Sequence, residues 1–289
     1  MTKPVSRYVH RNGEPSLHYF DWGGDGQELI LLHGLASNAR IWDLVAPILA
    51  ERFRVVALDQ RGHGRSEPAD DYGFEAVAQD VEDVADLLCF DRPVVVGHSW
   101  GGNVALQYAA TRRPPPTGLV LVDGGFLDLR IDPERTWDEV AADLAPPNLA
   151  GLSTDELRGQ IREWTNGYWS EPVQDAVLAN FHADECGTIR PHLDRSDHLA
   201  ILRALWEQRP AALYPDVVSP TLVVVAEQWQ ERRPGWGDRR ARMIAAVESG
   251  LPNARVVRFA DTVHDVPLQR PAELAEQIAR FAASLAAGG

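Results

Sequence analysis

The sequence predicts an α/β fold: a mostly parallel, doubly wound sheet with an inserted helical cap. Six short runs are rich in Val, Leu and Ile without polar alternation, as expected of strands buried on both faces. Helical patterns separate most of these runs. From about Phe126 to Tyr214 this rhythm stops and only helical stretches occur. We therefore expect a core domain of residues 1–125 and 215–289, and a helical cap of residues 126–214.

The expected elements alternate along the chain. Each apolar run has the length of a strand, and these runs are residues 28–34, 53–59, 92–99, 117–125, 220–227 and 254–261. The expected helices of the core are residues 41–51, 74–89, 103–112, 239–249 and 272–287. The cap follows the strand 117–125, and we expect it to cover the substrate, an ordinary helical subdomain being the alternative.

The charge and cysteine content of the chain disfavour several classes of function. The chain has 289 residues with 28 basic and 42 acidic side chains, a formal net charge of −14. Such a balance disfavours nucleic acid or an anionic membrane as a partner. The two cysteines, Cys89 and Cys186, give no disulfide framework and no metal cluster. Because neither a signal peptide nor a bilayer-spanning run is recognisable, we expect a cytoplasmic protein. We also expect no metal or organic cofactor.

A serine lies at the joint between a strand and a helix. Residues 97–101 read GHSWG, which fits the G-x-S-x-G pattern of a sharp turn that exposes the serine Oγ above a sheet. The runs VVV before the pattern and NVALQYAA after it supply the required strand and helix. The glycines are needed because a Cβ at either one would collide with the neighbouring chain. We expect Ser99 to be a nucleophile, favoured by the helix N-terminus, and not only a helix cap.

Four motifs in order resemble the signatures of the α/β-hydrolase fold superfamily. They are LLHGLASNARIWD (31–43), VVALDQRGHGRSE (55–67), VVVGHSWGGNVAL (94–106) and DTVHDVPLQRPAELA (261–275). The resemblance covers nearly the whole chain apart from the cap, and it is far more specific for fold than for substrate. It implies a nucleophile, an acid and a base in that chain order. The second motif is expected to be scaffold, with Arg61 paired to a local acid.

The resemblance also implies an oxyanion site made of two backbone amides. One is the amide of Trp100, directly after the nucleophile. The other is the amide of Leu35, which follows the pair His33-Gly34 at the end of an earlier strand. We expect His33 and His98 to be structural, and the ring of Trp100 to form a wall of the acyl pocket.

His264 is the expected base, because it lies between the last strand and the terminal helix, where the resemblance places that residue. The acid departs from the common pattern of the superfamily. Residues 226–229 read AEQW, so Trp229 stands where an aspartate is expected. An indole is only a hydrogen-bond donor, so it cannot accept the N–H of the histidine.

Asp123 is the acid that we expect instead. Certain dehalogenases and lactone hydrolases of the superfamily carry their acid at the end of the sixth strand, and Asp123 occupies that place in LVLVDGG. Both places are physically equivalent, because neighbouring strands deliver the two loops to one rim of the sheet. The alternative is that Asp123 has no catalytic role and only caps the turn that follows the strand. The other candidate acids are Glu227, Asp128 and Asp238, whereas Asp265 is too close to the base in sequence for a usable geometry.

The expected function is hydrolysis of a carboxylic ester or lactone through a Ser-His-Asp triad and an acyl-enzyme. The partner is then a small-molecule ester or lactone, and the oligomeric state is left open. Tryptophans of the cap are expected to bind the substrate, namely Trp137, Trp164 and Trp169. A C–C bond hydrolase, an amidase, a perhydrolase and a slow-turnover ligand receptor are the alternatives. Dehalogenase and epoxide hydrolase chemistry is disfavoured, because those relatives carry Asp where this chain has Ser99.

Overall fold

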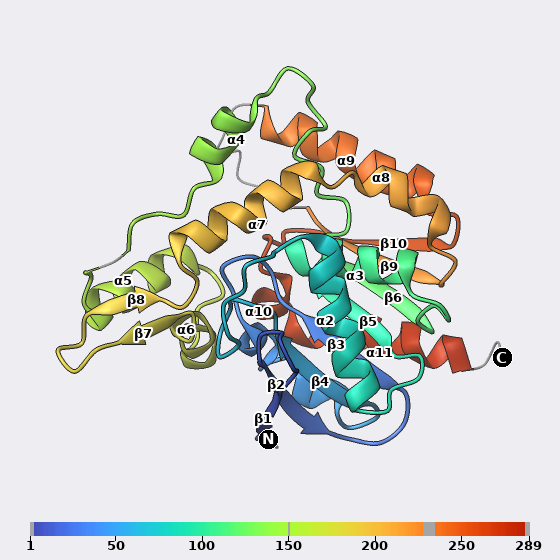
Figure 1. Ribbon diagram of the computed structural model, residues 1–289, viewed down its shortest axis with the longest axis horizontal. Coiled ribbons are helices and arrows are strands. Elements are labelled where there is room, and N and C mark those ends of the chain that lie inside the picture. Colours follow the sequence, from blue (N-terminus) through green and yellow to red (C-terminus); the bar gives the residue numbers. More distant parts are fainter. Residues whose placement is uncertain (1–2, 150, 228–234, 287–289) are drawn as a thin grey trace.

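An eight-stranded sheet forms the centre of the computed structural model, which describes residues 3–149, 151–227 and 235–286 (Figure 1). The strand order is β1-β2-β4-β3-β5-β6-β9-β10. Strand β2 is antiparallel to both of its neighbours, and the other neighbouring pairs are parallel. The strands are β1 (Val5–Val9), β2 (Leu17–Gly23), β3 (Glu28–Leu32), β4 (Arg54–Asp59), β5 (Val94–His98), β6 (Gly118–Val122), β9 (Thr221–Ala226) and β10 (Ala254–Phe259). The predicted fold class is confirmed.

The six predicted strands are β3, β4, β5, β6, β9 and β10. Strands β1 and β2 were not predicted. They form an antiparallel edge of the sheet, and four of the five residues of β1 are exposed. The exposed edge strand β1 needs no continuous apolar run. Strand β2 is mostly buried, but its sequence LHYFDWG interrupts the apolar residues with His18 and Asp21, so it also lacks the continuous pattern.

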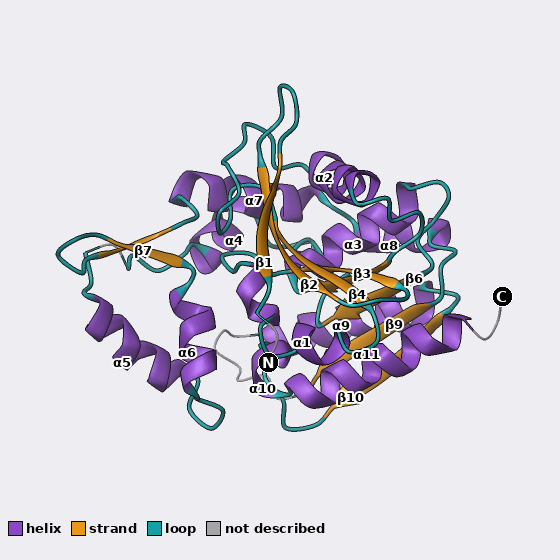
Figure 2. Ribbon diagram, turned by 90° about the horizontal axis from the view of Figure 1, so that it is seen from below, coloured by secondary structure: helices purple, strands orange, loops and turns teal. Residues whose placement is uncertain are grey.

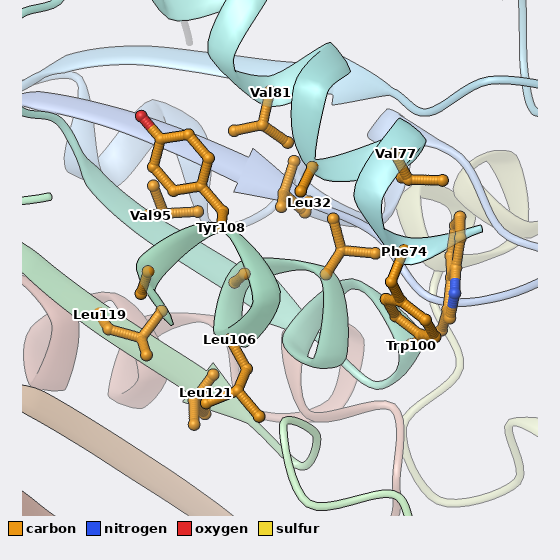
Figure 3. Close-up of a cluster of buried hydrophobic side chains, with 14 of the residues drawn as sticks. Leu32, Phe74, Val77, Val81, Val95, Trp100, Leu106, Tyr108, Leu119 and Leu121 are labelled. Carbon is orange, nitrogen blue, oxygen red and sulfur yellow. The ribbon is translucent and has the colours of Figure 1, made fainter. Parts of the chain in front are cut away.

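Helices cover both faces of the sheet, as Figure 2 shows from below. Alternate strand residues pack against two separate apolar clusters, because side chains of a strand point to opposite faces. Figure 3 shows part of one cluster, where Val77 and Val81 of α2 and Leu106 of α3 lie over strand residues such as Val95. The core helices are η1 (Ala39–Trp42), α1 (Ala46–Leu49), α2 (Phe74–Leu87), α3 (Trp100–Thr111), α9 (Trp236–Gly250), α10 (Val266–Gln269) and α11 (Pro271–Ala286).

Residues 126–214 lie between β6 and β9. In Figure 1, α5, α6, β7 and β8 lie together beside the sheet, and α7 runs from them toward α8. The elements are α4 (Trp137–Leu144), α5 (Thr154–Trp164), α6 (Glu171–Leu178), β7 (Phe181–Ala183), β8 (Ile189–Pro191), α7 (Arg195–Glu207), α8 (Pro210–Leu213) and η2 (Tyr214–Asp216). The prediction that this segment contains only helices is wrong, because β7 and β8 pair as a two-stranded antiparallel sheet. Each of these strands has only three residues and is partly exposed, so neither shows the apolar pattern from which a strand can be predicted.

Candidate active site

Three side chains meet at the carboxyl end of the parallel strands. Ser99 follows β5, Asp123 follows β6, and His264 lies in the loop after β10. The Nε2 atom of His264 is 2.8 Å from the Oγ of Ser99, and its Nδ1 atom is 2.7 Å from Oδ2 of Asp123. The structure thus brings together the three side chains that sequence reasoning proposed as nucleophile, base and acid.

The turn at Ser99 is strained. Its φ of 54° and ψ of −122° lie outside the regions that residues with a side chain normally adopt. The Ser99 N–H donates to the carbonyl of Val122 at 3.0 Å, which ties the turn to β6. An added Cβ on Gly97 would strike the carbonyl oxygen of Gly101, and one on Gly101 would strike the backbone after β3. The two glycines therefore permit the close approach that holds the hydroxyl above the sheet.

Asp123 is a buried carboxylate with three partners. Its Oδ2 accepts from His264, and its Oδ1 accepts from the amide of Ala226 at 3.1 Å and from the guanidinium of Arg240. Burial by itself would raise the pKa of Asp123, but the bond from His264 and the charges of His264 and Arg240 outweigh it and lower this pKa. The acid is therefore ionised when His264 is neutral.

Arg240 is a residue of the site that sequence reasoning missed. It lies on α9 and is 6% exposed, and besides Asp123 it donates to the carbonyl of Ala226 at 2.8 Å. A signal was present in the sequence. Arg240 is in helical phase with the buried apolar residues Met243, Ile244 and Val247, and an arginine within an apolar stripe needs a buried partner.

His264 has the electrostatic setting of a general base. Burial lowers its pKa, but the hydrogen bond and charge of Asp123 more than offset this, so the pKa of His264 is raised above its ordinary value. If Nδ1–H donates to Asp123, Nε2 is left to accept the hydroxyl proton of Ser99. The neighbouring His98 donates from Nε2 to the backbone carbonyl of His264 at 2.9 Å. His98 thus supports the base loop, and burial followed by the His264 charge lowers its own pKa to about 4.

The alternative acids have other surroundings. Glu227 is 41% exposed at its side chain and lies 3.8 Å from a guanidinium nitrogen of Arg258. The tryptophan Trp229, which replaces the common aspartate, lies outside the described residues, as does Gln228. The remaining carboxylates are placed as follows: Asp128 accepts from Arg209, Asp265 accepts from the hydroxyl of Tyr168, and Asp238 lies in the first turn of α9.

The two amides predicted for the oxyanion site flank the nucleophile. A Cβ on Gly34 would lie 3.5 Å from the Oγ of Ser99, so the loop that carries Leu35 lies directly against the serine. Among the described residues, neither the amide of Leu35 nor that of Trp100 donates a hydrogen bond. His33 is structural as expected, since its Nδ1 donates to the carbonyl of Gly34 and its Nε2 accepts from a backbone amide.

The ring of Trp100 was predicted to form a wall of the acyl pocket, and this prediction is wrong. It is 1% exposed and lies in the core beside Phe74 and Val77, as Figure 3 shows. Its other face stacks on the ring of His63, with 5.2 Å between the centroids. Only the backbone of Trp100 is therefore available to the site.

Two adjoining cavities lie above the serine. The smaller, of about 190 Å³, contains Ser99, His264 and Leu35. The larger, of about 780 Å³, is lined mainly by residues between β6 and β9. The cavities share four lining residues, which are Ala36, Ser37, Val177 and Asn180. The larger cavity therefore extends the space in front of the nucleophile toward the inserted segment.

Of the three tryptophans predicted to bind substrate, only Trp164 lines the larger cavity. Trp137 packs against Trp206, with 6.3 Å between ring centroids, and is not among the residues that line the described cavities. Trp169 likewise lies away from these cavities, and the guanidinium of Arg162 lies 4.2 Å from its ring centroid. Trp137 and Trp169 therefore lie outside the lining of these two cavities, and their rings contact residues of the same inserted segment.

The fold is that of a hydrolase family, and comparison of sequences agrees. Residues 29–277 match the family described as alpha/beta hydrolase family, so the chain belongs to the alpha/beta hydrolase family. It is 29% identical to lipase LipV of Mycobacterium tuberculosis over 268 residues, which cover 91% of this chain and 96% of that protein. It is 42% identical to the N-formylmaleamate deformylase of Pseudomonas putida over 154 residues, 52% of this chain and 56% of that protein.

Other relatives match over shorter segments. An uncharacterised protein of Mycobacterium tuberculosis is 39% identical over 107 residues, which are 37% of this chain and 31% of that protein. The match thus spans about a third of the relative's length. This match supports membership of the family but does not indicate a particular activity.

Solved structures show the same fold. E-2-(acetamidomethylene)succinate hydrolase superposes with a TM-score of 0.76 at 21% identity, covering 96% of this chain and 98% of that chain. N-formylmaleamic acid deformylase of Pseudomonas putida S16 gives a TM-score of 0.70 at 23% identity, covering 95% and 100%. At such identities the likeness establishes the fold alone.

The described residues contain no group of three or more His, Cys, Asp or Glu side chains placed to hold a metal ion. Cys89 and Cys186 are both free and exposed. In the described part of the chain, every helix is too short or too polar to cross a membrane.

Proposed function

We propose that this protein is a serine hydrolase that cleaves a carboxylic ester or lactone through an acyl-enzyme on Ser99. The observation that carries the proposal is the continuous relay from the Oγ of Ser99 through His264 to Asp123, with contacts of 2.8 and 2.7 Å. A serine hydroxyl is a weak nucleophile unless an oriented base takes its proton, and this relay supplies the base and its orientation.

The first half of the reaction forms the acyl-enzyme. His264 accepts the hydroxyl proton of Ser99 at Nε2 while Oγ attacks the substrate carbonyl. The carbonyl oxygen becomes negative and accepts hydrogen bonds from the amides of Leu35 and Trp100. Each such donor contributes about 3 kcal/mol to transition-state stabilisation in comparable sites.

The second half releases the acyl group. The imidazolium of His264, stabilised by the carboxylate of Asp123, gives its proton to the leaving alkoxide. A water molecule then donates a proton to His264 and attacks the acyl carbonyl, and the proton returns to the Oγ of Ser99. Asp123 stays ionised throughout, in keeping with its lowered pKa.

Residues 126–214 form the cap in this proposal, and residues 1–125 with 215–289 form the core. Support comes from the larger cavity, which the inserted segment lines with Trp164, Phe181 and Leu193. Asn38 of the core donates to Asn180 of the insert at 2.5 Å, close to the shared wall of the two cavities.

Amide hydrolysis is the second candidate. The alignment with the N-formylmaleamate deformylase, 42% identical over 154 residues, favours it. The same relay serves this reaction, because His264 protonates a leaving nitrogen as well as a leaving oxygen. The two candidates differ in the leaving group and share Ser99.

The experiment is a screen of p-nitrophenyl esters, lactones and N-acyl amides with the wild-type protein and the Ser99→Ala variant. We expect Ser99-dependent turnover of at least one class, with kcat in the range of roughly 1–10³ s⁻¹ that is typical of enzymes. Tight binding with turnover far below that range would identify a receptor. Equal turnover by Ser99→Ala would contradict the proposal.

A further inference from the structure

The larger cavity carries positive charge in an acidic protein. The chain has a net charge of −14, yet two arginines, Arg190 and Arg195, line this cavity with one carboxylate, Asp194, among its described lining residues. The imidazoles of the cavity are neutral at neutral pH, because burial lowers the pKa of His63 to about 3 and that of His192 to about 4, and it lowers the pKa of His198 as well. At neutral pH the lining therefore holds two guanidinium groups against one carboxylate.

These guanidinium groups lack counter-ions in the described part of the chain. Arg190, in β8, makes neither a side-chain hydrogen bond nor an ion pair there. Arg195, at the start of α7, donates to the carbonyl of Pro146 at 3.0 Å and has no carboxylate partner among the described residues. By contrast, Arg203 on α7 and Arg209 just after this helix both pair with carboxylates. The arginines that line the cavity remain available to a ligand.

The position of the charge relative to the nucleophile defines a ligand shape. The cavity of about 780 Å³ shares Ala36 and Val177 with the space around Ser99, so a single molecule can occupy both. Arg190 and Arg195 line the larger cavity and not the smaller one around Ser99. The larger cavity also has an apolar lining that includes Trp164, Phe181 and Leu193. A matching ligand places a carbonyl at Ser99 in the smaller cavity and an apolar stretch with an anion in the larger one.

We propose that the substrate carries a carboxylate, remote from the bond that is cleaved, which Arg190 binds with the assistance of Arg195. A guanidinium presents two parallel N–H donors that match the two oxygens of a carboxylate. The inference rests on the proposed function and names its substrate class: mono-esters or amides of carboxylic acids that bear a second, free carboxylate.

The test compares esters that differ only in the distal charge. Mono-p-nitrophenyl adipate and suberate are compared with p-nitrophenyl hexanoate and octanoate, and the Ser99→Ala protein is the blank. We expect kcat/KM to be about tenfold or more higher for at least one carboxylate ester than for its uncharged partner, as a charge-assisted bond provides. The preference should weaken as NaCl rises from about 0.05 M to about 0.5 M, because salt screens a partly open site.

Variants assign the preference to the cavity. Arg190→Gln should remove most of the carboxylate preference, measured as the ratio of kcat/KM for the carboxylate ester to kcat/KM for its uncharged partner, and Arg190→Lys should keep part of it. Arg52→Gln is the matched control, since Arg52 is also exposed and lies outside the described cavities. It should leave the preference unchanged.

The outcomes separate this inference from the proposed function. Ser99-dependent cleavage of the uncharged esters without any carboxylate preference, or a preference that survives in Arg190→Gln, overturns the anion site alone. Absence of Ser99-dependent cleavage of every ester overturns the proposed function and the anion site with it.

Discussion

At the scale of single residues, three donors fix the carboxylate of Asp123. They come from His264 after β10, from the amide of Ala226 at the end of β9, and from Arg240 on α9. Because β9 lies beside β6 in the sheet, its end supplies an amide to the acid instead of carrying the acid itself. This explains how the site is assembled with a carboxylate after β6.

The assignment of the acid predicts unequal effects of two amide substitutions. Asp123→Asn should lower kcat by roughly 10³- to 10⁴-fold, because an amide cannot stabilise the imidazolium and favours the wrong tautomer of the base. Glu227→Gln, which changes a half-exposed group beside Arg258, should leave kcat within about twofold. Steady-state kinetics on one p-nitrophenyl ester measures both. Loss of activity in Glu227→Gln with activity retained in Asp123→Asn would instead identify Glu227, directly after β9, as the acid.

The pH profile tests the setting of the base. The raised pKa of His264 means that the imidazole is protonated, and so inactive, up to a higher pH than usual. The acid limb of kcat/KM should therefore have its midpoint above about 6.5, the ordinary value for histidine. The charge of Arg240 lowers the pKa of His264, so Arg240→Gln should move this midpoint to still higher pH.

Arg242→Gln is the control for that shift, because Arg242 is exposed on the same helix and donates to the carbonyl of Ile131. Its profile should match the wild type. A midpoint that moves to lower pH in Arg240→Gln would refute this account of Arg240.

At the scale of elements, a buried ion pair joins the loop after β4 to α2. The guanidinium of Arg61 makes two bonds to the carboxylate of Asp80, at 2.6 and 2.7 Å, which confirms the local acid expected for Arg61. Arg11 adds a third contact to the same carboxylate at 2.6 Å. The loop that holds Arg61 also carries His63, whose Nε2 accepts from the amide of Ala36 beside the nucleophile. The pair thus supports the wall of the site from behind.

Removing the charge of Asp80 should therefore destabilise the fold. Asp80→Asn leaves the buried guanidinium of Arg61 without its close counter-ion, and we expect a loss of about 3–5 kcal/mol in the free energy of unfolding. Asp83→Asn is the matched control on the same helix, where a 27% exposed carboxylate pairs with Arg11 and should contribute less than about 1 kcal/mol. Urea denaturation measures both. Equal losses in the free energy of unfolding would show that the buried ion pair of Asp80 stabilises the fold no more than the exposed pair of Asp83.

The elements divide into those that the sequence pattern defines and those that tertiary contacts define. Strands β3 to β6, β9 and β10 were predictable because burial on both faces imposes continuous apolar runs. The edge strand β1 and the short β7 and β8 carry no such signature, since their exposed backbone tolerates polar residues. Ser99 and His264 were recognisable from motif and position. The roles of Arg240 and of the tryptophan rings depend on how α9 and the insert pack, which local pattern does not specify.

At the scale of the whole molecule, the insert and the core together line the larger cavity. The larger cavity combines core residues such as Ala36 and His63 with insert residues such as Trp164 and Arg190. The contact between Asn38 and Asn180 joins the two parts at the shared wall. In the proposed function, the insert would therefore select the size and charge of the substrate, and the core would supply the chemistry.

This division predicts separate effects of two tryptophans. Trp164→Ala should raise KM for a bulky p-nitrophenyl ester by roughly three- to tenfold and leave kcat nearly unchanged, because a lining ring is lost while the relay is intact. Trp169→Ala, whose ring lies under Arg162, should leave KM unchanged. Equal changes of KM in both variants, measured at several ester sizes, would contradict the placement of the cavity.

The most direct test of the account follows covalent labelling by a fluorophosphonate, with the modified residue located by peptide mass spectrometry. The account predicts one adduct, on the Oγ of Ser99, that is absent in Ser99→Ala and forms far more slowly in His264→Gln. Labelling of Ser99→Ala at the wild-type rate, or an adduct on another residue, would show that the hydroxyl next to His264 is not the activated nucleophile.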